Sequence, residues 1–103
     1  MIIIHIVNSV TWEKNKENSQ YFGETLKSQG FIHCCLPKQV DDVLKNWFPK
    51  REDLIFLEID ADKLSSRLIL ENLEGGEERF PHVYGPINHN AIISWYPSKK
   101  TKG

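Results

Sequence analysis

The sequence lacks an excess of charge of either sign. Its 103 residues contain 13 lysines and arginines and 14 aspartates and glutamates, so the formal net charge is −1. Such a balance gives no strong field to attract nucleic acid or an anionic membrane. The stripe of basic residues that is typical of nucleic-acid-binding proteins is also absent. We therefore expect neither nucleic acid nor a membrane as a partner.

Cysteine is scarce, and its placement argues against a disulfide framework. The two cysteines, Cys34 and Cys35, are adjacent in the chain, and a bond between neighbours would be strained. Although His33 precedes them, adjacent thiols lack the ligand spacing of a structural zinc site. We expect two buried free thiols and no bound metal.

Long hydrophobic runs are missing as well. The apolar residues 1–7 are far fewer than the roughly 20 that a membrane-spanning helix needs, and they lack the basic region and cleavage site of a secretion signal. The composition, with 40% apolar residues, is typical of a globular protein. We expect a soluble cytoplasmic protein with a single domain over residues 1–96, followed by a basic flexible tail over residues 97–103.

The hydrophobic pattern that is present predicts an α+β fold. Residues 2–7 place apolar side chains on both faces of a strand, which is typical of a central strand. Further strands are expected over residues 31–34, 54–59, 68–73 and 91–96. The order of these elements predicts one compact domain with a mixed or antiparallel sheet of about five or six strands and two or three short helices.

The clearest periodic signal predicts an amphipathic helix over residues 40–48. Its apolar residues recur at helical spacing and form one stripe: Val40, Val43, Leu44, Trp47 and Phe48. Pro49 would end this helix. We expect the whole stripe, including Trp47, to pack in the core. A second, shorter helix is expected after Asn8, whose side chain can cap a helix N-terminus.

Polar residues set in apolar segments are the candidates for function. His5, His33 and His82 each lie among apolar neighbours, and Glu71 shares a strand face with Ile69. Such groups must find polar partners or line a cleft. We predict that His5, His33, Glu71 and His82 line one cavity. The alternatives are core histidines with satisfied hydrogen bonds and a glutamate that faces water.

Five segments together resemble the domain of unknown function family 952. They are residues 4–6 (IHI), 30–34 (GFIHC), 57–60 (LEID), a strand that ends in Glu71, and residues 80–86 (FPHVYGP). The resemblance runs from about His5 to Ile93. Members of the family are small bacterial proteins, grouped with the ADP-ribosyltransferase superfamily. The resemblance therefore implies an ADP-ribosyltransferase-like fold with a split sheet and a cleft of the size of NAD, and it does not by itself establish an activity.

The resemblance also implies roles for individual residues. The order His5, His33, Glu71 can be laid onto the pattern of histidine, tyrosine or histidine, and glutamate in ADP-ribosyltransferases, although no tyrosine fills the second place. Glu71 would stabilise the positive charge that develops when the glycosidic bond of NAD breaks. His5 would bind a ribose hydroxyl and His33 the nicotinamide end. The entrance would be lined by Phe80, His82 and Tyr84.

Two classes of function remain open. The first is an enzyme that uses NAD as a substrate, for ADP-ribosyl transfer or for cleavage of the glycosidic bond. The second is a non-enzymatic module that holds a nucleotide, a small metabolite or a protein. A glutathione-using transferase is disfavoured, because it would need a thioredoxin-like domain and a helical domain, and the chain is too short for both. We expect a small nucleotide ligand and leave the oligomeric state open.

Overall fold

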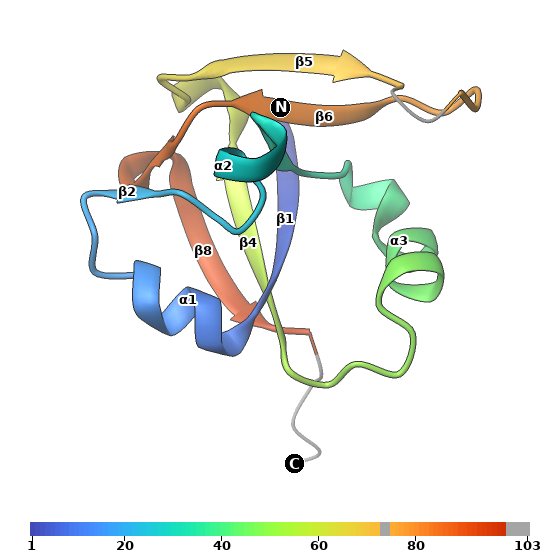
Figure 1. The fold of residues 1–103 in the computed structure, drawn as a ribbon, viewed down its shortest axis with the longest axis horizontal. Helices are drawn as coiled ribbons and strands as arrows, with labels where there is room; N and C mark the ends of the chain where they lie inside the picture. Colours follow the sequence, from blue (N-terminus) through green and yellow to red (C-terminus); the bar gives the residue numbers. More distant parts are fainter. Residues whose placement is uncertain (73–74, 99–103) are drawn as a thin grey trace.

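Two strands rich in isoleucine and leucine run through the middle of the structure. The computed structural model describes residues 1–72 and 75–98. In it, β1 (Ile2–Asn8) pairs antiparallel with β4 (Leu54–Asp60), which pairs antiparallel with β8 (Ile92–Pro97) (Figure 1). The central strand of this sheet is thus β4, and the prediction that residues 2–7 form a central strand is wrong.

A second sheet lies across one end of the first. It consists of β3 (Ile32–His33), β6 (Phe80–Tyr84) and β5 (Arg67–Glu71), all antiparallel and in that order (Figure 1). The backbones of Ile4 and Cys35 exchange two hydrogen bonds of 2.7 Å, which join the two sheets. A small third sheet pairs β2 (Gln20–Tyr21) with β7 (Ile87–Asn88).

Helices cover the edges of this arrangement. They are α1 (Ser9–Asn15), α2 (Leu26–Gln29), α3 (Val40–Trp47) and three short 3₁₀ helices at Pro37–Gln39, Ala61–Lys63 and His89–Ala91. The side chain of Asn8 caps α1, as predicted, by accepting a 2.8 Å hydrogen bond from the backbone of Thr11. Within residues 1–72 and 75–98, no helix is long and apolar enough to span a membrane.

The predicted class, a compact α+β domain with antiparallel strands and short helices, is confirmed. The described residues form eight strands rather than the five or six predicted. The excess comes from β2, β6 and β7. β2 and β7 have two residues each and are too short to show a period in the sequence. β6 contains Pro81, and a proline argues against a strand in the middle of a sheet.

Two predicted boundaries also shift. β8 extends to Pro97, which pairs with Ile55, so Pro97 belongs to the sheet and not to the predicted tail. The backbone N–H of Ser98, the next residue of that tail, donates to the carbonyl of Leu54, and residues 99–103 lie outside the described residues. β5 begins at Arg67 and ends at Glu71, and Leu73, the last residue of the strand predicted there, is also outside them.

The hydrophobic core is divided by β1 and β4. The first cluster includes Ile3 and Val7 of β1, and the second includes Ile4. Successive side chains of a strand point to opposite faces, so a strand between two clusters is apolar on both. This explains why β1 has the sequence of a central strand although it lies at the edge of its sheet. Cys34 lies in the first cluster and Cys35 in the second, both as free buried thiols, as predicted.

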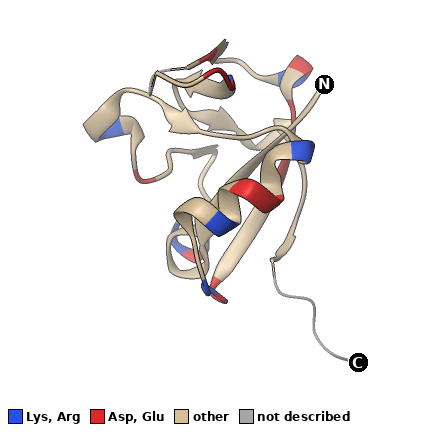
Figure 2. Ribbon diagram, turned by 90° about the vertical axis from the view of Figure 1, so that its right-hand side faces the viewer, with Lys and Arg blue, Asp and Glu red and all other residues tan. Residues whose placement is uncertain are grey.

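The predicted core role of Trp47 is wrong. The second cluster has few buried members, and the residues of the apolar stripe that pack on it are only Val40, Val43 and Leu44. Trp47 is 61% exposed. The first two turns of α3 therefore cover this cluster, and the indole at the end of the helix extends beyond it. Figure 2 shows that acidic and basic residues are interspersed over the described chain, in keeping with its balanced charge.

Candidate functional site

Most of the predicted site residues share one face of the β3–β6–β5 sheet. Across the strands, His33 lies opposite His82, and Glu71 lies opposite Phe80. Opposed residues of antiparallel strands share a face, and every second residue along a strand returns to it. We call this surface the histidine face, and it comprises Phe31, His33, Arg67, Ile69, Glu71, Phe80, His82 and Tyr84. The opposite face carries Ile32 and Val83, which are buried in the core.

A hydrogen-bonded carboxylate, that of Glu71 at the end of β5, lies on the histidine face. Nδ1 of His82 lies 2.9 Å from Oε2 of Glu71, and the hydroxyl of Tyr84 donates to the same oxygen. The bonds from Tyr84 and His82 lower the pKa of Glu71, while the bond to Glu71 raises the pKa of Tyr84. Glu71 is therefore ionised at neutral pH, with its side chain 21% exposed.

Four rings cluster on the histidine face, two of which bond to this carboxylate. The centroid of the Phe31 ring lies 4.7 Å from that of His33, 4.4 Å from that of His82 and 5.3 Å from that of Tyr84. The two histidine rings meet edge to face with centroids 5.4 Å apart. Nε2 of His33 lies 2.8 Å from the side-chain oxygen of Gln29, the last residue of α2. Such a group of rings is suited to contact a planar ligand.

His5 lies behind the histidine face rather than on it. Its Nδ1 is 2.6 Å from the backbone carbonyl of His33, and its Nε2 is 2.7 Å from the hydroxyl of Tyr21. A carbonyl can only accept, so Nδ1 carries the proton and Nε2 accepts from Tyr21. Burial lowers the pKa of His5 to about 4, so this ring is neutral.

The structure thus brings together three of the four residues predicted to line one cavity. His33, Glu71 and His82 share the histidine face, with Tyr84 and Phe80 beside them. The placement of His5 in that group is corrected, because both of its ring nitrogens are bonded inside the protein. Its position allows it to hold the backbone of His33 and leaves no nitrogen for a ribose hydroxyl.

The comparisons with known proteins place the chain in a family. The model of a family described as protein of unknown function (DUF952) matches residues 6–95. The chain belongs to this family. The matched range includes every residue of the histidine face and begins one residue after His5.

Solved structures similar to this DUF952 chain come from Caulobacter crescentus. The crystal structure of its protein CC0527 has a TM-score of 0.80 and 26% sequence identity, covering 94% of this chain and 85% of that one. The solution NMR structure of the same protein has a TM-score of 0.79 and 27% identity, covering 93% and 83%. The comparison with curated proteins gave no match.

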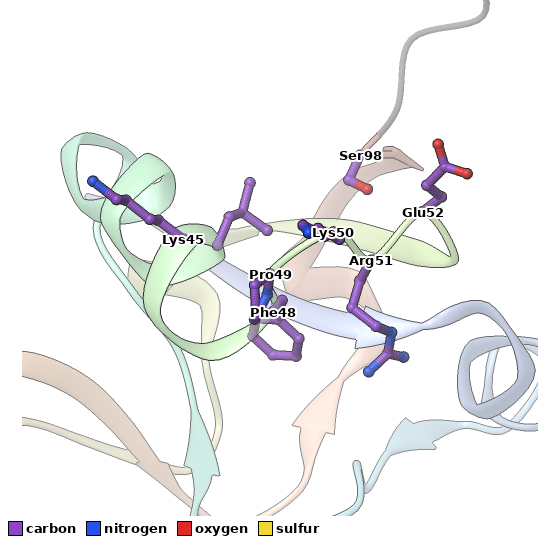
Figure 3. Close-up of a pocket in the computed structure, with 8 residues that line it drawn as sticks. Lys45, Phe48, Pro49, Lys50, Arg51, Glu52 and Ser98 are labelled. Carbon is purple, nitrogen blue, oxygen red and sulfur yellow. The ribbon is translucent and has the colours of Figure 1, made fainter.

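A hollow near the end of α3 is a poorer candidate for a site in this DUF952 chain. Its lining residues include Lys45, Phe48, Arg51 and Glu52. Figure 3 shows the charged ends of Lys45, Arg51 and Glu52 pointing away from one another. Arg51 donates two hydrogen bonds of 2.7 Å to the carboxylate of Asp53. Polar groups that diverge in this way do not converge on a ligand.

Metal chemistry also finds little support in the described part of the chain. Residues 1–72 and 75–98 contain no group of three or more His, Cys, Asp or Glu side chains that could hold a metal ion. Burial raises the pKa of both thiols, to about 12 for Cys35, so neither is a ready nucleophile or ligand.

Sequence reasoning missed several residues of this DUF952 site. Phe31 and Arg67 lie on the histidine face, and alternation would have placed Phe31 there, two residues before His33. Arg67 needed the pairing of β5 with β6, which places it opposite Tyr84. Tyr21, the hydrogen-bond partner of His5, had no sequence signal, since it comes from a distant two-residue strand.

Proposed function

We propose that the histidine face binds NAD and cleaves the bond between its nicotinamide and ribose. The ADP-ribose is released into water or passed to an acceptor. The observation that carries this proposal is the ionised carboxylate of Glu71, which His82 and Tyr84 hold on a face lined by rings. This use of the site rests on a fold of the ADP-ribosyltransferase type, which we also propose, with the two joined antiparallel sheets in its support.

The chemistry of the bond requires a negative charge close to the ribose. As the bond to nicotinamide breaks, positive charge develops on the ribose ring, and a fixed carboxylate stabilises it. His82 and Tyr84 both bond to Oε2 of Glu71, and no group among the described residues donates to Oε1. Oε1 is therefore the oxygen that would face the ribose.

The surrounding residues fit the other parts of NAD. The rings of Phe31 and His33 offer a surface for the planar nicotinamide. Arg67, exposed and opposite Tyr84, would place a positive charge at one end of the face, where it can bind the pyrophosphate. His5 would act indirectly, because its bond to the carbonyl of His33 fixes the strand that carries His33.

A binding module that holds a nucleotide without turning it over is the second candidate. The observation that favours it is the saturation of Oε2 of Glu71, which accepts from two side chains and could serve to hold β5 against β6. Under this alternative, the rings and Arg67 would bind the nucleotide, and Glu71 would be structural.

Release of nicotinamide from NAD distinguishes the two candidates. We would measure it by chromatography for the wild type, for Glu71→Gln and for Glu58→Gln, a matched control at a half-buried glutamate of β4 in the other sheet. Glutamine keeps the shape and accepting oxygen of Glu71 but removes the charge. We expect Glu71→Gln to lower kcat about 100-fold or more with little change in affinity, and Glu58→Gln to match the wild type.

The other outcomes are equally informative. A wild-type protein that binds NAD without releasing nicotinamide would favour the binding module. A wild-type protein that does not bind NAD would refute both candidates for this ligand. Full activity in Glu71→Gln would keep the enzyme and remove Glu71 from its mechanism.

A further inference from the structure

One ring nitrogen of His82 has no hydrogen-bond partner in the part of the chain that the structure describes. The other nitrogen, Nδ1, faces the ionised carboxylate of Glu71 at 2.9 Å, so Nδ1 carries a proton, and in the neutral ring Nε2 holds a lone pair. No group in residues 1–72 and 75–98 bonds to Nε2. Among the described residues, the fully buried side-chain nitrogens and oxygens without a partner are those of Trp12 and His89. Nε2 of His82 is therefore not fully buried, although the whole side chain is only 7% exposed.

A histidine oriented in this way can accept a proton. The carboxylate of Glu71 fixes the tautomer, and it would stabilise the positive charge of the ring after the proton arrives. Tyr84 donates to the same carboxylate oxygen, and Phe31 packs its ring 4.4 Å from the ring of His82, so the imidazole is held on two sides. Glu71 and Tyr84 are positioning residues for this step.

We infer that the acceptor of ADP-ribose at this site is an oxygen nucleophile, water or an alcohol, and that its proton passes to Nε2 of His82. This inference rests on the proposed cleavage of NAD. The oxygen forms a bond to the anomeric carbon of the ribose while the bond to nicotinamide breaks. The electron pair of the broken bond stays on nicotinamide, which leaves neutral, and the proton of the O–H group moves to Nε2.

The class of acceptor follows from the base. An O–H group becomes acidic as its oxygen bonds to carbon, so an imidazole can take the proton during the reaction. A guanidinium has no lone pair to offer until it loses a proton, and its pKa is above about 12. The difference between this pKa and that of an imidazole is too large for the imidazole to remove the proton, so arginine side chains are disfavoured as acceptors.

Product analysis tests the acceptor. NAD is incubated with the wild-type protein in water, in water with methanol, and in water with agmatine, which carries a guanidinium. We expect ADP-ribose in all three, an additional O-methyl product with methanol, and no product on agmatine. An adduct on agmatine that forms in preference to hydrolysis would overturn the inference.

Chemical rescue tests His82. We expect His82→Ala to lose about 100-fold or more of the nicotinamide release and added imidazole to restore part of it. A purely structural role gives no such rescue. His89→Gln, at a histidine outside the histidine face, is the control and should keep full activity. Loss without rescue, or no loss, would overturn the assignment of His82 as the base.

A third measurement on the wild-type protein does not depend on the folding of any variant. Long-range ¹⁵N NMR of the histidine rings should show His82 with its proton on Nδ1 and a bare Nε2, and a proton on Nε2 of the neutral ring would overturn the inference. The failures are distinguishable. A wild type that releases no nicotinamide refutes the proposed function and this inference with it, whereas undiminished release by His82→Ala refutes the inference alone.

Discussion

The buried His5 predicts a specific dependence of stability on pH. In the folded protein its pKa is lowered from 6.5 to about 4, chiefly by burial, and its side chain is neutral. In the unfolded chain the ring titrates near its ordinary value of about 6.5. Between these two values the unfolded chain binds a proton that the folded protein does not bind. The free energy of unfolding therefore falls as the pH falls from about 6.5 to about 4.

The size of the effect follows from the two pKa values of His5. Each pH unit between them is worth up to about 1.4 kcal/mol, so lowering the pH from 7 to 5 should remove about 2 kcal/mol of stability. The lowered pKa of the Glu71 carboxyl does not interfere, because stability from a depressed carboxyl pKa is lost only at lower pH, as that carboxyl becomes protonated.

The assay is urea unfolding followed by tryptophan fluorescence at pH 7 and pH 5, on the wild type and on His5→Gln. A glutamine can donate to the carbonyl of His33 and accept from Tyr21, as His5 does, but it does not titrate. The difference in stability between the two proteins should change by about 2 kcal/mol between these pH values. An equal loss in both would refute the account of His5 as a buried neutral ring.

Three further predictions concern packing, the thiols and the hydrogen bond of Tyr21. Trp12→Ala should lower the free energy of unfolding by roughly 3–5 kcal/mol, since Trp12 is 2% exposed. Trp47→Ala should change it by less than about 1 kcal/mol. Equal midpoints of urea unfolding for the two variants would contradict this. Cys34 and Cys35 should react with a thiol reagent at pH 8 only after unfolding, because burial raises both pKa values, and prompt labelling of the native protein would refute it. Tyr21→Phe should cost roughly 1–3 kcal/mol by leaving a buried ring nitrogen unpaired, which the same unfolding curves would show.

Much of the fold could be predicted because it follows from local patterns. The apolar runs of β1 and β4 and the capping residue Asn8 are visible in the sequence, and each forms the expected element. The amphipathic pattern of α3 predicted a helix and the direction of its apolar side. It could not predict where the core beneath the helix ends, and so the predicted burial of Trp47 was wrong.

The site shows the same division. Polar residues in apolar segments identified His33, Glu71 and His82, because such residues need partners wherever they lie. Their common face depends on the pairing of β3, β6 and β5, which are distant in sequence, and this register has no local signature. The bond from His5 to a backbone carbonyl was also beyond prediction, since every residue has such a carbonyl.

Mapping the binding of NAD onto the protein tests the central claim most directly. In a titration of ¹⁵N-labelled protein with NAD, followed by the backbone amide signals, we expect the largest changes in β3, β5 and β6, around His33, Glu71 and His82. The amides around Arg51, beside the hollow at the end of α3, should stay unchanged. No change on adding NAD, or changes centred on Arg51, would contradict the assignment of the histidine face as the site.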